Sequence, residues 1–364
     1  MKITELMPML RLHGRTVMDE AKEALFLNWT CAGFSVAFTG TYLKAKTLVL
    51  GDLGPAFPGF PPPEPDFPCL GAVADGSEEL CYREELKADG WVTVFTAEEK
   101  SAHTLRLIKL SENARGKLGI AELETDGEFI PVKLEAKPVI EFVGDSITCG
   151  FGNETTDGGM MFKTSEENGW KSYAALAARE LGYEYSLVCE SGISASKPMT
   201  SFMPMHAMDE IYALTDEMYD KKREVAPAKW DFAANPSKVV VVNLGTNDAT
   251  PIKFYQDATE LKPMEEWFRT HYRAFIEQIR SLNGPDTFIV CTLGTMDYYL
   301  FNQIDNAVRE YQEATGDKKI CAFKMVGINQ MTEGMGGGGH PSLKTHIRMG
   351  HELATLMKQY VPGL

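Results

Sequence analysis

The pattern of hydrophobic positions divides the chain near residue 136. Before this point, short runs of aromatic and β-branched residues lie between glycines and turn residues, without long helical periods between them. The clearest runs are residues 33–40, 43–50, 91–95 and 103–110. Runs of this kind are typical of antiparallel strands, so we expect residues 1–135 to form a β-sandwich of the jelly-roll type.

Over residues 136–364, apolar strands alternate with amphipathic helical segments. Residues 238–243 read Lys-Val-Val-Val-Val-Asn, a continuous run typical of strands buried on both faces. The other expected strands are residues 138–143, 184–189, 287–292 and 319–325, and the expected helices are residues 170–181, 263–281, 304–314 and 342–360. This alternation predicts an α/β domain with a parallel sheet of about five strands in a three-layer, flavodoxin-like arrangement.

A proline-rich segment, residues 54–68, interrupts the first half of the chain. Proline has no amide donor, so we expect this segment to lie outside any β-ladder. A flap over a binding site or an oligomer contact is one interpretation. An irregular hairpin insertion is the other, and we favour it. The role of the segment and the oligomeric state of the protein are left open.

The chain is acidic, with 36 basic and 51 acidic residues and a formal net charge of −15. Nucleic-acid binding depends on neutralising phosphates, so we expect no nucleic-acid partner. Seven cysteines without a Cys-x-x-Cys pair predict reduced thiols in a cytoplasmic protein. The sequence lacks a signal-peptide core and any run of roughly 18 apolar residues, so we expect no membrane partner. It also lacks phosphate-binding, dinucleotide-binding and metal-binding motifs, so we expect no cofactor and no metal.

Residues able to do chemistry follow four of the expected strands. Gly144-Asp145-Ser146 follows the first strand, Gly192 the second, Asn247 the third and His340 the last. The carboxyl ends of parallel strands face one crevice, so these residues are expected at one edge of the sheet. Acyl transfer requires a nucleophilic oxygen, a base and hydrogen-bond donors for the oxyanion, and the four positions supply all three. A serine in such a turn can also simply cap a helix, and the turn alone does not separate the two interpretations.

These four blocks, in this order and spacing, resemble the SGNH (GDSL-type) hydrolase superfamily. In the first half, Leu12-His13-Gly14-Arg15, Trp29 with residues 33–40, and residues 103–109 resemble the jelly-roll domain of carbohydrate esterase family 2. Enzymes of that family couple a β-sandwich to an SGNH domain and remove O-acetyl groups from plant polysaccharides such as xylan and mannan. The resemblance covers nearly the whole chain.

The resemblance implies a role for each of the four positions. Ser146 would be the nucleophile, and His340 would be the general base and then the general acid. The backbone amides of Ser146 and Gly192, with the side chain of Asn247, would form the oxyanion hole. The implied activity is that of a serine acetylesterase that deacetylates plant-derived manno- or xylo-oligosaccharides, with an acetylated oligosaccharide as its partner.

One position departs from the superfamily pattern. An aspartate usually stands three residues before the histidine, where this chain has Gly337, and the nearest upstream carboxylate is Glu333. A triad acid orients the imidazole and stabilises its charged form, whereas a backbone carbonyl can fix the tautomer without supplying charge. Glycines let a carbonyl approach a ring closely. We therefore favour a Ser146–His340 dyad supported by a carbonyl over recruitment of Glu333.

Two other functions stay open. One is an SGNH acylesterase or lysophospholipase that acts on other small esters. The other is a carbohydrate-binding protein whose catalytic site has decayed, which the missing aspartate suggests. Among the remaining residues, we interpret Asp145 and Asp248 as structural, Trp170 as a candidate for stacking on a sugar ring, and His103 as an ordinary histidine without a partner pattern.

Overall fold

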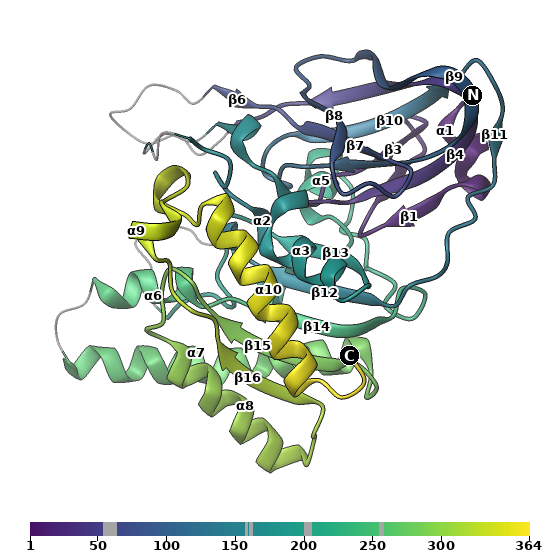
Figure 1. Ribbon diagram of the computed structural model, residues 1–364. Helices are drawn as coiled ribbons and strands as arrows, with labels where there is room; N and C mark the ends of the chain where they lie inside the picture. Colours follow the sequence, from purple (N-terminus) through teal and green to yellow (C-terminus); the bar gives the residue numbers. More distant parts are fainter. Residues whose placement is uncertain (54–63, 157–158, 160–162, 200–205, 255–257) are drawn as a thin grey trace. The chain divides into compact units, whose positions relative to one another are not determined.

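The computed structural model describes residues 1–53, 64–156, 159, 163–199, 206–254 and 258–364 (Figure 1). The chain forms two compact units. The first contains Met1–Ala136, Lys163–Gly169 and Thr215–Ala228, and the second contains Lys137–Phe162, Trp170–Leu214 and Lys229–Leu364. The sequence pattern marks the transition near residue 136 but gives no sign that two later segments belong to the first unit.

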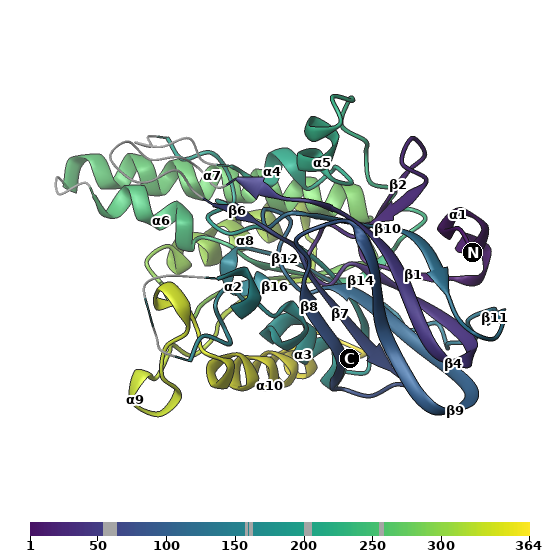
Figure 2. The ribbon, with the colours of Figure 1, turned by 90° about the horizontal axis from the view of Figure 1, so that it is seen from above.

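The first unit is built around a curled antiparallel sheet (Figure 2). Its described strands are β1 Arg11–His13, β2 Val17–Asp19, β3 Ala24–Phe26, β4 Gly33–Leu50, β7 Cys69–Ala74, β8 Leu80–Glu85, β9 Gly90–Lys109, β10 Lys117–Glu124 and β11 Phe129–Ile130. Their order is β2-β3-β10-β4-β9-β7-β8, and β1 and β11 also pair with β4. Two short helices, α1 (Ile3–Leu6) and α5 (Glu217–Lys222), belong to the same unit.

The core of this unit follows the alternating pattern of β4 and β9. Phe34 lies opposite Leu107 and Val36 lies opposite Leu105, and all four side chains are buried. Residues two apart on a strand point to the same face of a sheet. One face of the β4–β9 pair therefore carries large, buried apolar side chains.

Strands β4 and β9 are longer than the sequence predicts. The runs 33–40 and 43–50 form one continuous strand, and so do the runs 91–95 and 103–110. The register of β4 against β9 shifts between Gly40 and Tyr42. A bulge of this kind bends a strand without ending it, so the interruption in the pattern marks a bend and not a turn.

The proline-rich segment begins and ends in a short hairpin. Strand β5 (Asp52–Leu53) pairs with β6 (Pro65–Asp66) in antiparallel register, while residues 54–63 lie outside the described part of the chain. The prediction that the whole segment stays outside any ladder is therefore wrong at Pro65. A proline is tolerated in an edge strand of this length because its missing amide need not face a neighbour.

A buried carboxylate ties the segment 215–228 into the first unit. Asp216 accepts hydrogen bonds from the side-chain amides of Asn28 at 2.6 Å and Asn113 at 2.9 Å. It also accepts the backbone amide of Tyr219 at 3.0 Å. The two asparagines and the aspartate are all buried, so each depends on this network for its hydrogen bonds.

Asp216→Ala should therefore lower the free energy of unfolding by about 2–4 kcal/mol, because two buried amides lose their acceptor. Urea denaturation followed by circular dichroism measures this change. Asp126→Ala is the matched control, since Asp126 is an exposed carboxylate of the same unit that accepts the backbone amide of Thr41. Equal and small losses for the two variants would contradict the role given to Asp216.

The second unit contains a parallel sheet. Its strands are β12 Val139–Gly144, β13 Glu184–Cys189, β14 Ser237–Asn243, β15 Phe288–Leu293 and β16 Ile320–Lys324. Their order is β13-β12-β14-β15-β16, and every neighbouring pair is parallel. This is the flavodoxin-like strand order expected from the sequence.

Helices cover both faces of this sheet. Helices α3 (Tyr173–Glu180) and α10 (Leu343–Tyr360) lie on one face, and α7 (Ala258–Asn283) and α8 (Phe301–Thr315) lie on the other (Figure 2). The shorter helices are α2 Ser146–Cys149, α4 Met208–Ile211, α6 Thr246–Lys253 and α9 Gln330–Glu333. Among the described helices of the chain, none combines the length and the apolar character needed to cross a membrane.

Candidate active site

Ser146 lies where β12 ends and α2 begins. Asp145 is the N-cap of this helix, and its side chain accepts the backbone amide of Ile147 at 3.0 Å. Burial raises the pKa of Asp145 to about 7. A Cβ at Gly144 would lie 2.0 Å from Thr148 Oγ1, so only glycine permits this approach. The Gly-Asp-Ser sequence thus forms a tight strand-to-helix turn, in which Asp145 has the structural role predicted for it.

The structure brings His340 to Ser146. His340 Nε2 lies 2.8 Å from Ser146 Oγ, although the two residues are 194 positions apart in the sequence. The Phe151 ring packs against the imidazole, with the ring centroids 4.3 Å apart. Ser146 is only 7% exposed and His340 is half-buried. A hydroxyl that faces an imidazole nitrogen in a shielded place is the arrangement that nucleophilic catalysis requires.

The other nitrogen of His340 faces a backbone carbonyl. Nδ1 lies 3.3 Å from the carbonyl oxygen of Gly338, whose backbone is left-handed with φ of 58°. The backbone amide of Gly337 donates to the carbonyl of Gly152 at 2.9 Å and so holds this turn. A Cβ at position 337 would lie 2.7 Å from Thr155 Oγ1. An aspartate at this position would therefore require Thr155 to shift.

Glu333, the alternative acid, is bound elsewhere. Its carboxylate accepts hydrogen bonds from Arg348 Nε at 2.5 Å, from Thr345 Oγ1 at 2.9 Å and from the backbone amide of Asn329 at 3.1 Å. Burial alone would raise the pKa of Glu333, but these hydrogen bonds outweigh burial and hold the pKa below its ordinary value. The carboxylate therefore acts as a fixed negative charge at the start of α10.

Backbone pairing places two further turns beside Ser146. Gly144 lies opposite Cys189 of β13 and opposite Asn243 of β14. The backbone amide of Glu190 donates to the carbonyl of Gly144 at 3.3 Å. The ends of the three strands that precede the site residues therefore meet at one edge of the sheet, as the sequence predicts.

Gly192 and Asn247 lie on these two turns. Gly192 has a left-handed backbone with φ of 81°, and a Cβ there would meet no described atom within 4 Å. Asn247 Nδ2 donates to the carbonyl of Ile193 at 2.9 Å. Asp248 accepts the backbone amide of Ala195 at 3.0 Å, and burial raises the pKa of Asp248 to about 7. These bonds hold the Asn247 side chain beside an open glycine turn, which is the neighbourhood that a shared oxyanion hole requires.

A buried polar network next to the helix of Ser146 is a feature that the sequence does not predict. The Tyr173 hydroxyl lies 2.9 Å from Thr148 Oγ1 and accepts the side-chain amide of Asn243 at 3.1 Å. The backbone amide of Tyr173 donates to His346 Nδ1 at 3.1 Å. Burial lowers the pKa of His346 to about 3, so this imidazole is neutral. The network joins α2, the helix that begins at Ser146, to the sheet and to α10.

The predicted sugar-stacking role of Trp170 is wrong. Its side chain is buried, and the guanidinium of Arg179 lies 4.0 Å from its ring centroid. The indole therefore packs inside the second unit and already has a cation over one face.

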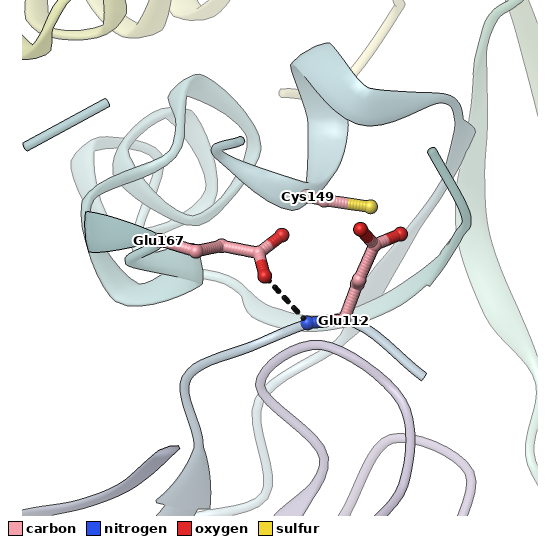
Figure 3. Close-up of side chains that lie close together, drawn as sticks. All are labelled: Glu112, Cys149 and Glu167. Atoms are coloured by element: carbon pink, nitrogen blue, oxygen red, sulfur yellow. Dashed lines mark hydrogen bonds between the residues drawn. The ribbon is translucent and has the colours of Figure 1, made fainter. Parts of the chain in front are cut away.

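Two buried carboxylates also lie close together in the first unit. Glu167 accepts the backbone amide of Glu112 at 3.1 Å (Figure 3), and both side chains are buried. Burial and the neighbouring Glu112 raise the pKa of Glu167 well above its ordinary value. Arg115 Nε lies 3.2 Å from the Glu112 carboxylate, so a protein cation already accompanies the pair and we interpret it as structural.

Comparison with known proteins identifies the family of the chain. Residues 140–353 match the GDSL-like lipase/acylhydrolase family, and the chain belongs to this family of carboxylic ester hydrolases. It is similar to the cellulase/esterase CelE of Acetivibrio thermocellus, with 31% identity over 271 residues. That match covers 71% of this chain but only 30% of CelE. A second relative, an acetylxylan esterase/glucomannan deacetylase of Cellvibrio japonicus, is 27% identical over 283 residues, which cover 71% of this chain and 69% of that protein.

Solved structures extend the likeness to both units. A family two carbohydrate esterase from Clostridium thermocellum, in complex with cellohexaose, matches with a TM-score of 0.81 and 25% identity, covering 98% of this chain and 100% of that one. An acetyl xylan esterase from the rumen bacterium Butyrivibrio proteoclasticus matches in fold with a TM-score of 0.83 and 20% identity, covering 99% and 98% of the two chains. The antiparallel unit is therefore part of the likeness.

Tyr173→Phe should lower kcat for ester hydrolysis while leaving KM nearly unchanged, because the network that fixes the helix of Ser146 loses its central hydroxyl. Thr148 and Asn243 would then lose a hydrogen-bond partner in a buried place, which should lower the free energy of unfolding by about 1–3 kcal/mol. Steady-state kinetics and urea denaturation measure the two effects.

Tyr212→Phe provides the control for this prediction. The Tyr212 hydroxyl is also buried; it donates to Glu141 at 2.7 Å and accepts the side-chain amide of Asn283 at 2.8 Å. A comparable loss of stability with unchanged kcat is expected. If both variants lose kcat equally, the network has no specific connection to the nucleophile.

Proposed function

We propose that this protein is a carbohydrate O-acetyl esterase that acts through an acyl-enzyme on Ser146. The observation that carries the proposal is the 2.8 Å contact between Ser146 Oγ and His340 Nε2 within a domain of the GDSL family. Similarity to proteins named acetylxylan esterase/glucomannan deacetylase supports acetyl as the acyl group. The expected substrates are acetylated manno- or xylo-oligosaccharides of plant origin.

The first half of the reaction acylates the serine. His340 Nε2 accepts the proton of Ser146 as Oγ attacks the acetyl carbonyl. The tetrahedral oxyanion accepts hydrogen bonds from the amides of Ser146 and Gly192 and from the Asn247 side chain. A side-chain amide has two N–H groups, so Asn247 can keep its bond to Ile193 and donate the second to the oxyanion. The intermediate collapses, and the sugar hydroxyl leaves with the proton from His340.

The second half releases acetate. Water enters as the sugar departs, and His340 takes its proton while the water oxygen attacks the acetyl carbon of the ester. A second oxyanion forms in the same place and is stabilised by the same donors. Its collapse breaks the bond to Ser146 Oγ, which regains its proton from His340, and the enzyme returns to its starting state.

We assign the orientation of the base to the carbonyl of Gly338. When Nδ1 carries a proton and donates it to this carbonyl, Nε2 is free to accept from Ser146. In a Ser-His-Asp triad, replacing the acid so that the wrong tautomer forms lowers kcat by about 10⁴. A carbonyl avoids this penalty because it accepts only from the correct tautomer, although it supplies no charge. The proposed catalytic unit is therefore a Ser146–His340 dyad.

One proposal about the fold accompanies this function. We propose that the antiparallel first unit is the jelly-roll companion domain of family two carbohydrate esterases, supported by the likeness of structures over nearly the whole chain. The cytoplasmic location expected from the cysteines stays a prediction.

A second candidate function is an acylesterase with a preference for longer acyl chains. A small apolar pocket in the second unit favours it. The pocket adjoins Asp248, the neighbour of Asn247, and its walls are mainly apolar, including Ile252, Met264, Trp267 and Phe268.

Acyl-chain preference separates the two candidates. Hydrolysis of p-nitrophenyl acetate, butyrate and octanoate is compared first, and the acetylesterase predicts the highest kcat/KM for acetate. NMR product mapping on acetylated manno- and xylo-oligosaccharides then identifies the sugar and the position of the released acetyl group. Ser146→Ala should abolish this turnover. Preference for octanoate would support the second candidate, and no turnover by the unaltered protein would indicate a decayed site.

Asn247→Ala should reduce kcat for acetyl-ester hydrolysis by about 10²–10³, as expected for loss of one oxyanion donor. KM should change much less, because the donor acts mainly on the transition state. Asn235→Ala is the matched control, since the Asn235 side chain is exposed and donates to the carbonyl of Asp231. If Asn247→Ala lowers kcat by less than about threefold, the assignment of Asn247 to the oxyanion hole is contradicted.

A further inference from the structure

A second serine–histidine–carboxylate arrangement lies in the first unit. Ser101 and His103 are two residues apart on β9, so their side chains point to the same face of the strand. Ser101 Oγ lies 2.8 Å from His103 Nε2, and His103 Nδ1 lies 2.9 Å from Asp75 Oδ2. Asp75 follows β7, the strand that pairs with β9. The sequence gives no sign of this arrangement, because Asp75 is 28 positions from the histidine.

The carboxylate is held firmly. Its second oxygen, Asp75 Oδ1, accepts the backbone amide of Thr104 at 2.8 Å. The backbone amide of Asp75 donates to the carbonyl of Thr104 at 2.8 Å. Backbone and side chain of Asp75 are therefore both tied to β9, so the carboxylate oxygen that faces the imidazole has a fixed position.

The imidazole is shielded while the hydroxyl is accessible. The His103 side chain is 11% exposed, and its ring lies 4.6 Å from the Phe95 centroid and 5.8 Å from the Phe38 centroid. Ser101 is exposed. The carboxylate accepts from Nδ1–H, which leaves the lone pair of Nε2 free to accept the serine proton. A reagent can therefore reach the hydroxyl from solvent while its base stays ordered.

These groups have the roles of a nucleophile, a base and an orienting acid, and such a unit is recognised by its geometry and not by sequence position. We propose that Ser101 is a second acylation site that accepts acyl groups from activated esters. Ser101 Oγ attacks the ester carbonyl and His103 Nε2 takes the hydroxyl proton. The bond to the leaving alcohol then breaks, and the leaving group departs with a proton or as the anion.

The expected rate follows from what surrounds the serine. The contacts of the described residues give Ser101 no donor pair like Gly192 and Asn247, and each missing donor lowers the rate by about 10²–10³. Acylation of Ser101 should therefore be much slower than that of Ser146. The same deficit slows hydrolysis of the acyl-serine, so the product should accumulate as a stoichiometric ester.

The test uses the full chain with Ser146→Ala, which removes the proposed main nucleophile. The protein is incubated with p-nitrophenyl acetate, and peptide mapping by mass spectrometry distinguishes acetylserine from acetyl-lysine. Acetylation is expected at Ser101. Adding His103→Gln should slow it at least tenfold, and adding Asp75→Asn should slow it to a smaller degree.

Ser77 provides the matched control serine. It lies in the same unit, and its hydroxyl accepts the backbone amide of Glu79 at 3.0 Å. Acetylation of Ser77 at the rate of Ser101 would show that the labelling reflects exposure alone and would overturn the proposal. So would absence of acetyl on Ser101, or labelling of Ser101 that is unchanged by Asp75→Asn and His103→Gln. If His103→Gln fails to fold, the Asp75→Asn comparison decides the question.

Discussion

The contact between Ser146 and His340 depends on the geometry of a parallel sheet. Ser146 follows β12, and His340 follows the last strand and the glycine turn before α10. A hydrogen bond of 2.8 Å tolerates little displacement, so both ends of it must be held. The network of Thr148 and Tyr173 fixes the serine end, and the bond between Gly337 and Gly152 fixes the histidine end. Most of the second unit can be understood as support for this one contact.

The glycine turn before α10 also determines which polar and charged groups face His340. The glycine turn brings a carbonyl to His340 Nδ1, and the crowding of position 337 against Thr155 disfavours a carboxylate there. Glu333 lies four residues upstream of Gly337, and its charge is already shared among Arg348 and its other donors. The carbonyl of Gly338 faces His340 Nδ1, and we propose that this contact fixes the tautomer of the imidazole.

The local pattern of apolar residues was enough to predict the parallel sheet of the second unit. It did not predict contacts between residues that are far apart in the sequence. The strands of the parallel sheet are short apolar runs, so they could be read from the sequence, whereas the catalytic roles of the residues that come after these strands stay a prediction. The bulge of β4 against β9 and the pairing of His103 with Asp75 both depend on residues far apart in the chain. No periodicity or turn signal encodes such contacts, and for His103 the sequence suggested an ordinary residue.

We propose that the glycine turn at residues 336–339 orients His340 and that Glu333 does not. Glu333→Gln keeps the shape of the side chain while removing its charge, and kcat/KM for acetyl-ester hydrolysis measures the consequence. A value within about threefold of the unaltered protein is expected. A loss on the order of 10⁴, as follows disruption of the acid in a Ser-His-Asp triad, would contradict it and identify Glu333 as the missing acid.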